Sequence, residues 1–180
     1  DSLLPEFSRA AQILHQKNPN LNFLCLRAPN VSADRLRALW PASVPVSIIE
    51  PEDRYRAIKS CNLMIAASGT ATLECALIGT PTIAAYKVSK LTYSLGKLVV
   101  KARWMSLANW IFEETVLPEL LQEEADGPNV AALAARWLAE PEITQGIRQK
   151  LSALRELLGP PGATDRAADI ILRDLGIAGP

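Results

Sequence analysis

Short apolar runs alternate with helical segments through the first half of the chain, and this alternation limits the fold more than any other feature. The apolar runs are as long as buried strands and lie at Leu21–Leu26, Val46–Ile49, Leu63–Ala67 and Thr82–Tyr86. The helical segments between them lie at Ser32–Trp40, Glu52–Ser60 and Thr70–Ile78. This order predicts βα units and a parallel sheet. Strands that are almost wholly apolar indicate a sheet covered on both faces.

Helical patterns surround this region on both sides. Leu3, Phe7 and Leu14 belong to a periodic apolar set, which predicts a helix capped by Asp1 or Ser2. A chain that begins at a helix cap is interpreted as a fragment. Further helices are expected at about 90–104, 116–125, 128–139, 142–158 and 163–175. The predicted fold is one α/β domain over 1–180, a Rossmann-like parallel sheet flanked by helices, with 140–180 as a terminal helical segment.

Composition excludes several functional classes. The 19 basic and 19 acidic residues give no net charge, which argues against a nucleic-acid-binding protein. No apolar run reaches the roughly 18 residues that a membrane-spanning helix needs. The cysteines lack metal-site spacing, so Cys25 and Cys75 are expected to be small buried apolar residues. No acidic pair or histidine cluster indicates a metal, and the single histidine, His15, is not expected to be catalytic.

The stretch AASGTATLECALIGTPTIAAYK, residues 66–87, places Ser68-Gly69-Thr70 between a predicted strand and a predicted helix. In an open parallel sheet, ligands bind beyond the carboxyl ends of the strands. The first amides of a helix have no internal partner, and the helix dipole makes this end positive, which suits a phosphate. Gly69 permits close approach of the backbone, and Ser68, Thr70 and Thr72 add hydroxyl groups.

Glu74 falls one helical turn beyond Thr70, on the same face. Its carboxylate suits the vicinal hydroxyls of a ribose, so the stretch has groups for both parts of a nucleotide. The alternative is an ordinary helix start, because serine and threonine are common caps and acids are favoured near this end. Neither a Walker lysine nor a GxGxxG sequence is present.

The segments ASGTATLE, YKVS, SLANWI and VLPELLQEE follow one another in an order and spacing that resemble lipid-A-disaccharide synthases. The resemblance extends over the whole chain, from LLPEF to GPPGATDRAADIIL. Members of that family are glycosyltransferases of the two-domain GT-B fold. The resemblance implies that this chain is the C-terminal, UDP-binding domain, and that a first strand and an N-terminal domain with the acceptor site and general base precede Asp1.

The resemblance also implies a reaction. UDP-2,3-diacylglucosamine would be joined to 2,3-diacylglucosamine 1-phosphate with release of UDP, without a metal or other cofactor. This fragment alone would bind the nucleotide without turnover. The residues implied along the diphosphate, where they would stabilise transition-state charge, are Ser68, Gly69, Thr70 and Thr72. Glu74 would bind the ribose. The side chains implied to line the cleft towards the other domain are Asn109, Glu119 and Gln122. The segment Ile48–Arg54 would meet the uracil.

Basic and apolar residues interleave between residues 86 and 110, as on helices that lie on anionic membranes. The residues expected to contact a membrane are Lys90, Lys97, Lys101, Arg103 and Trp104. The alternative is an ordinary amphipathic helix with its apolar side in the core. The resemblance implies a cytoplasmic, peripheral enzyme on the inner face of the cytoplasmic membrane. A missing central strand would leave an open sheet edge, which predicts a homodimer or a strand or domain swap.

Two departures from the family keep other functions open. Ala108 stands where the family more often has proline, and Phe112–Thr115 stands where it often has Ala-Gly-Arg-Glu. Acids near an anionic diphosphate would weaken binding. One alternative is therefore a divergent GT-B UDP-sugar transferase or epimerase. The other is a non-catalytic domain that binds a nucleotide sugar or a membrane.

Overall fold

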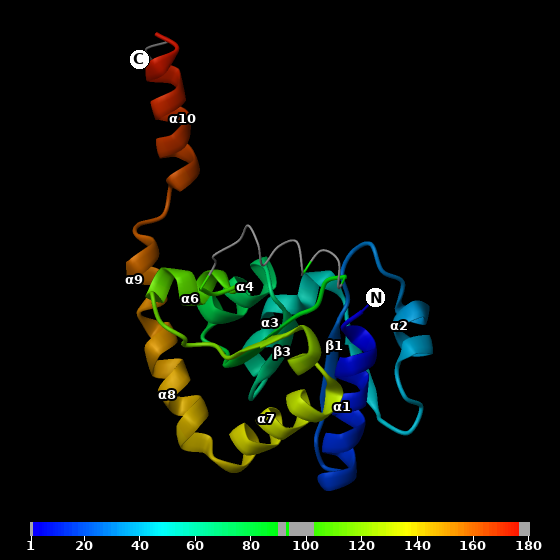
Figure 1. Ribbon diagram of the computed structural model, residues 1–180. Helices are drawn as coiled ribbons and strands as arrows, with labels where there is room; N and C mark the ends of the chain where they lie inside the picture. The colour runs from blue at the N-terminus through cyan, green and yellow to red at the C-terminus, as the bar shows by residue number, and fades with distance from the viewer. Residues whose placement is uncertain (1, 90–92, 94–102, 177–180) are drawn as a thin grey trace.

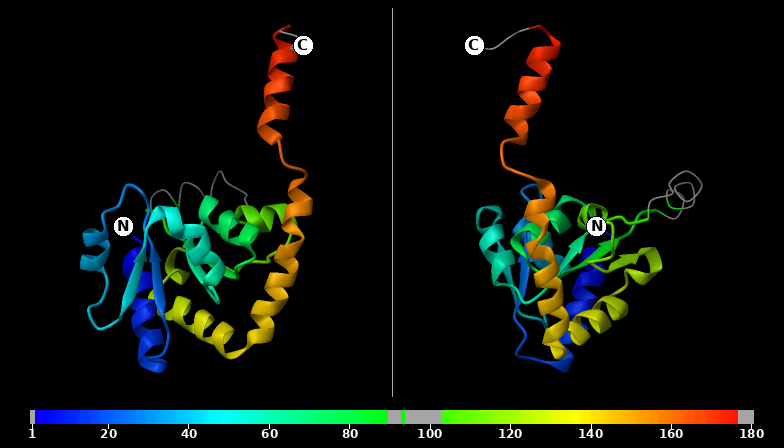
Figure 2. Two further views of the ribbon diagram at one scale, coloured as in Figure 1. Left: turned by 180° about the vertical axis from the view of Figure 1, so that it is seen from behind. Right: turned by 90° about the vertical axis from the view of Figure 1, so that its left-hand side faces the viewer.

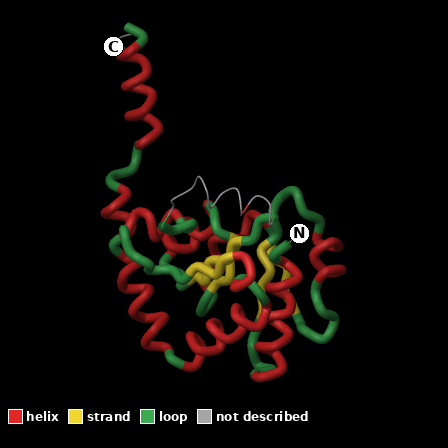
Figure 3. Tube along the Cα trace, viewed as in Figure 1, coloured by secondary structure: helices red, strands yellow, loops and turns green. Residues whose placement is uncertain are grey.

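A computed structural model describes residues 2–89, 93 and 103–176, and shows parallel strands between layers of helices (Figures 1 and 3). The strands are β1 (Phe23–Leu26), β2 (Val46–Ile49), β3 (Met64–Ala67), β4 (Thr82–Tyr86) and β5 (Glu119–Leu121). β1 pairs with β2, and β4 pairs with β3 on one side and β5 on the other, all in parallel. The predicted α/β, Rossmann-like class and its four strands are confirmed.

In the described part, one helix precedes the strands, others connect successive strands, and the rest form the C-terminal half. They are α1 (Leu4–Lys17), α2 (Ala33–Leu39), α3 (Arg54–Ser60), α4 (Thr70–Ile78), α6 (Leu107–Phe112), α7 (Gly127–Ala139), α8 (Pro141–Ser152), α9 (Leu154–Leu158) and α10 (Ala163–Asp174). Two 3-10 turns are η1 (Pro51–Asp53) and η2 (Gln122–Glu124). The helix predicted at 142–158 divides at Ala153 into α8 and α9.

Two apolar clusters hold these layers together. The first joins α1 and α7 to the strands through Ala10, Leu14, Ile83, Val130, Ala131, Ala134 and Trp137. The second joins α4, α6, α8 and α9 through Ala76, Ala108, Val116, Leu117, Leu151 and Leu154. Cys75 is buried, as predicted, and burial raises the pKa of its thiol to about 11. Cys25 is only half-buried.

Three sequence predictions were wrong or fall outside the described residues. Residues 116–125 were expected to be helical, but they contain β5 and η2. Glutamate and leucine favour a helix intrinsically, and pairing with β4 overrides that preference. Ser2 does not cap α1, whose N-cap is Leu3. The helix predicted over about 90–104 lies mostly outside the described residues, and α6 just after it was not predicted.

The sheet is divided into two parts rather than continuous. Within the described residues, no hydrogen-bonded ladder joins the β1–β2 pair to the β3–β4–β5 sheet. Helix α3 packs against both β1 and α4 and so connects the two parts. β1 and β3 therefore each keep one edge without a strand partner in the described part of the chain.

Helix α10 stands apart from the rest of the molecule (Figures 1 and 2). The segment Gly159–Gly162 connects it to α9 and contains two glycines with positive φ. Ile170, Ile171 and Leu175 are exposed along it. Helices α8, α9 and α10 thus lie within the predicted terminal segment, and α10 does not join the core.

Glu6 ties three elements together at the start of α1. Its Oε1 lies 2.9 Å from Nζ of Lys87, which follows β4, and its Oε2 accepts a 3.0 Å hydrogen bond from the Gly127 amide at the start of α7. The hydrogen bond from Lys87 holds the pKa of Glu6 below its usual value of 4.5. This carboxylate therefore anchors the contact between α1 and α7.

Replacing Glu6 with glutamine should lower the free energy of unfolding by about 1 kcal/mol at pH 7, because a partly exposed charged hydrogen bond is lost. A depressed folded-state pKa stabilises the fold above pH 4.5, and this contribution disappears as pH falls through the lower folded value. The difference between wild type and Glu6→Gln should therefore shrink towards pH 3.5. Urea unfolding at both pH values measures it, with exposed Glu142→Gln as control. A difference that stayed constant with pH would contradict this role.

Candidate functional site

The Ser68-Gly69-Thr70 turn leads directly from β3 into α4, as predicted. Gly69 is the N-cap and has φ 149° and ψ −152°, a region essentially limited to glycine. Helix α4 ends at Gly79, whose left-handed φ of 83° matches the predicted stop. The backbone at Gly69 turns sharply, so the first amides of α4 lie at the carboxyl end of β3.

The hydrogen-bond donors of this turn divide into used and available groups. The Ser68 amide donates to Ala85 O at 2.7 Å, and its hydroxyl donates to Met105 O at 2.9 Å. Thr72 is fully buried, and its hydroxyl donates to Gly69 O at 2.7 Å. The expected positions of Ser68 and Thr72 along a diphosphate stay a prediction, and in this structure both hydroxyls donate to the protein itself.

The available donors are backbone amides. Within the described residues, the amides of Gly69, Thr70 and Ala71 donate no hydrogen bond. Thr70 and Ala71 are exposed, and the Thr70 hydroxyl has no partner among the described groups. These amides, together with the positive end of the α4 dipole, form an arrangement that suits an anion.

Glu74 lies one turn further along α4 and faces Arg54 at the start of α3. The Arg54 Nε to Glu74 Oε2 distance is 3.4 Å, and the two side chains are 38% and 36% exposed. Arg54 also lies over the ring of Tyr55, 4.4 Å from its centroid. The Arg54–Glu74 pair brings the segment Ile48–Arg54 next to the start of α4. This is the segment that is expected to meet the uracil. The exposed part of the Glu74 carboxylate can accept further hydrogen bonds.

The resemblance implies that Asn109 lines the cleft, and in this structure its side chain is bound by the protein itself. It is fully buried in α6. Its Nδ2 donates to Leu117 O at 2.7 Å and to Glu119 Oε1 at 2.8 Å. Its Oδ1 accepts from the amides of Val116 at 2.9 Å and Leu117 at 2.8 Å. The side-chain amide is fully used inside the protein, so it has no free donor for a ligand.

Glu119 and Gln122 also bind the protein's own backbone. Glu119 accepts hydrogen bonds from the amides of Met105 at 2.7 Å and Ser106 at 2.9 Å. Gln122 accepts from the Val88 amide at 2.8 Å and donates to Val88 O at 3.2 Å. The expectation that they line the cleft stays a prediction, and in the structure both side chains bind neighbouring loops. Sequence reasoning missed these contacts because it predicted a helix over 116–125. A helix there leaves out β5, the strand that orients Glu119 and Gln122.

The expected membrane-contact residues are only partly described. Lys90, Lys97 and Lys101 lie outside the described residues. Trp104 is only 8% exposed, and its Nε1 donates to Thr115 Oγ1, so in this structure little of its surface is available to a membrane. Arg103 is exposed and lies over the Trp104 ring, 4.5 Å from its centroid. None of the described helices is long and apolar enough to cross a bilayer.

Two nearby side chains, one aromatic and one apolar, are exposed where Trp104 is not. Trp110 is 48% exposed, and Leu107 is 43% exposed. Trp110 packs edge-on against Trp104 at 5.8 Å between ring centroids, and its Nε1 donates to Trp104 O. Because these contacts fix the indole, its exposed part is presented in one orientation.

The departures from the family pattern do not lie at the α4 turn. Ala108 is fully buried in the second apolar cluster. Glu114 pairs with Lys150 of α8 at 2.8 Å. Glu113 occupies the left-handed C-cap of α6, with φ 55°. The structure thus uses these positions to end α6, to pack it against α4 and α9, and to join the following loop to α8.

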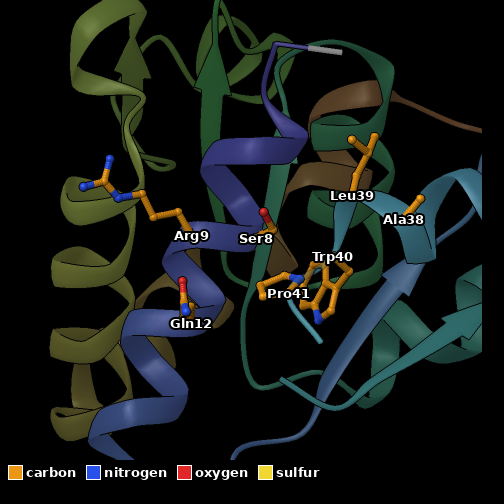
Figure 4. Close-up of a pocket in the computed structure, with 7 residues that line it drawn as sticks. All are labelled: Ser8, Arg9, Gln12, Ala38, Leu39, Trp40 and Pro41. Atoms are coloured by element: carbon orange, nitrogen blue, oxygen red, sulfur yellow. The ribbon is translucent and has the colours of Figure 1, made fainter. Parts of the chain in front are cut away.

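A shallow groove of about 490 Å³ lies elsewhere, between α1 and the end of α2. Figure 4 shows Ser8 and Gln12 on α1 across from Leu39, Trp40 and Pro41. None of its lining residues belongs to the α4 turn. The candidate site is therefore defined by amides and by Glu74, and not by this hollow.

Comparison with known proteins agrees with the resemblance in the sequence. Residues 1–168 match the family model of lipid-A-disaccharide synthetase. The chain belongs to this family. It is similar to lipid-A-disaccharide synthases from Trichlorobacter lovleyi, 39% identical over 94% of this chain and 44% of the relative, and from Geobacter sulfurreducens, 34% identical over 97% and 45%. The chain thus spans less than half the length of these relatives.

Replacing Gly69 with alanine should destabilise the protein by about 1–3 kcal/mol, because alanine disfavours this backbone conformation. A Cβ at this position meets no atom within 4 Å, so the cost is conformational rather than steric. Gly146→Ala in α8 is the matched control, since it also meets nothing within 4 Å but has helical backbone. The control should stabilise the protein by about 0.5–1 kcal/mol. Equal effects of the two variants in thermal unfolding would contradict the strained turn.

Proposed function

We propose that this chain is the UDP-sugar-binding part of a glycosyltransferase that joins UDP-2,3-diacylglucosamine to 2,3-diacylglucosamine 1-phosphate. The products are lipid A disaccharide 1-phosphate and UDP. The observation that carries the proposal is the set of available amides at Gly69, Thr70 and Ala71, with Glu74 one turn away, in a chain of this family. The relatives named lipid-A-disaccharide synthase support the substrate class.

The diphosphate of the donor lies against the first turn of α4 in this proposal. When the acceptor hydroxyl attacks the anomeric carbon, the bond to the diphosphate breaks and negative charge grows on the leaving UDP. Backbone amides that are already oriented stabilise this charge without reorganisation. The proposal needs no metal or other cofactor, and places the general base outside this chain.

Glu74 binds the ribose hydroxyls, and Arg54 reduces the electrostatic cost of placing a carboxylate near a diphosphate. Arg54 lies within 3.4 Å of Glu74, so the pair is close to neutral as the ligand approaches. Both side chains are partly exposed, so this ion pair contributes modestly and can rearrange around a ribose. The uracil lies near Ile48–Arg54, because this segment ends at the same pair.

The complete protein that carries this chain should bind UDP in calorimetric titration and bind ADP much more weakly. Glu74→Ala should reduce UDP affinity by roughly tenfold to a hundredfold, since two hydrogen bonds to a charged acceptor are lost. Glu142→Ala, which removes an exposed acid from α8, is the matched control and should retain affinity. UDP binding that is unaffected by Glu74→Ala would contradict the assignment of the ribose.

Membrane contact and location belong to the same proposal. Leu107 and Trp110 are exposed beside Arg103, and the basic residues Lys90, Lys97 and Lys101 are close to them in the sequence. Apolar and aromatic side chains beside cations suit the surface of an anionic bilayer. We therefore place the enzyme in the cytoplasm, peripherally on the inner face of the cytoplasmic membrane, where lipid-linked glucosamine is its acceptor.

Trp110→Ser should reduce co-sedimentation with vesicles that contain anionic phospholipid, because an exposed indole is removed from the contact. Leu39→Ser is the control, since Leu39 is 41% exposed but lies at the end of α2. Neutral vesicles should bind the wild type weakly. Equal retention of Trp110→Ser and wild type on anionic vesicles would contradict the proposed surface.

Self-association remains a prediction of the sequence. The edges of β1 and β3 that lack a strand partner among the described residues, and the exposed apolar residues of α10, are surfaces that a second copy would cover. A dimeric mass in light scattering would support a homodimer or an exchange of elements, and a monomeric mass at high concentration would oppose it.

No observation specifically favours the divergent or non-catalytic alternatives, since Ala108 lies in the core and Glu114 pairs with Lys150.

A further inference from the structure

The segment Met105–Ser106 is attached to the Ser68–Thr72 region by side-chain hydroxyls. Ser68 Oγ donates to Met105 O at 2.9 Å. Ser106 Oγ lies 3.5 Å from Thr72 Oγ1, which donates to Gly69 O at 2.7 Å. Ser106 and Thr72 are both fully buried, so water does not compete for the contact between their hydroxyls. Any displacement of this segment is therefore transmitted to the turn that carries the available amides.

The Glu119 carboxylate holds the same segment from the opposite side. Its Oε2 accepts from the Met105 amide at 2.7 Å, and its Oε1 accepts from the Ser106 amide at 2.9 Å. Ala84 of β4 is the register partner of Glu119, and Ala66 of β3 is the partner of Ala84. These small side chains share one sheet face with Glu119. The carboxylate thus occupies the sheet face beneath the segment and is stabilised by charge-assisted hydrogen bonds.

Asn109 fixes the orientation of this carboxylate. Its Nδ2 donates to Glu119 Oε1 at 2.8 Å, while its Oδ1 is held by the amides of Val116 and Leu117. Rotation of the side-chain amide would leave buried groups without partners, which costs about 1–3 kcal/mol each. Asn109 therefore fixes one oxygen of Glu119, and Glu119 in turn fixes two consecutive amides.

We infer that Glu119 and Asn109 are positioning residues that set the geometry of the diphosphate-binding amides through Met105–Ser106 and Ser68. The inference rests on the proposed function, because it assigns how the same site is held. In this arrangement neither side chain touches the nucleotide. Ser68 is the connecting residue, since its amide and its hydroxyl both hold the protein. The effect of either residue on binding should therefore depend on the ligand's phosphates.

The first test replaces Glu119 with glutamine in the complete protein. Glutamine keeps the size of the side chain but directs an NH₂ group towards a backbone amide that needs an acceptor. UDP affinity should fall about tenfold, which corresponds to the loss of one charge-assisted hydrogen bond. Uridine lacks the diphosphate and should bind as it does to wild type in an NMR titration. Exposed Glu123→Gln carries the same charge change and should leave both affinities unchanged.

A second test examines whether Glu119 acts through Ser68. Ser68→Ala removes one hydrogen bond and should also weaken UDP binding while uridine binding persists. The double variant Glu119→Gln, Ser68→Ala should bind UDP about as well as the weaker single variant, because both changes release the same segment. Asn109→Asp should behave like Glu119→Gln, since it replaces the donor to Glu119 with a second acceptor.

The outcomes separate this inference from the proposed function. If wild type binds UDP and both Glu119→Gln and Ser68→Ala bind it equally well, the positioning role is overturned and the nucleotide site stands. Equal losses for uridine and UDP would indicate general structural damage and would also overturn it. Fully additive losses in the double variant would oppose transmission through Ser68. Absence of UDP binding by folded wild type would overturn both.

Discussion

Parallel pairing of β4 with β3 on one side and β5 on the other is the constraint on which the candidate site depends. Residues that are far apart in the sequence reach one region because these strands run in the same direction. The pairing places the Ser68 amide on Ala85 O and brings Glu119 next to Ala84. Without β5, the α4 turn would still form, but the amides of Met105 and Ser106 would lose their hydrogen bonds to Glu119.

The local part of this account could be predicted from the sequence. Apolar runs of strand length, the glycine at 69 and the stop at Gly79 are short-range signals, and they gave β3, the turn and α4 correctly. β5 was missed because its residues are good helix formers and only tertiary pairing makes them a strand. Helix α6 was not predicted, because the amphipathic pattern just before it indicated a helix over about 90–104 instead.

The same limit applies to the roles of individual side chains. The resemblance implies that Asn109, Glu119 and Gln122 line a cleft, and this stays a prediction. In the structure, Asn109 donates to Glu119, and Gln122 accepts from the Val88 amide. A sequence pattern cannot distinguish a residue that contacts a ligand from one that holds the neighbouring loop, because the two roles differ only in the three-dimensional arrangement. The distinction required the hydrogen-bond partners of each side chain. Similarly, Trp104 and Trp110 both look suited to an interface, but only Trp110 is exposed.

The most direct test of the central claim is a ¹⁵N-resolved NMR titration of the complete protein with UDP, which reports each backbone amide separately. The account predicts that the largest changes fall on the amides of Gly69, Thr70 and Ala71, with smaller changes at Ser68, whose amide already donates to Ala85. Large changes confined to the groove between Ser8 and Trp40, with the α4 amides unaffected, would contradict it.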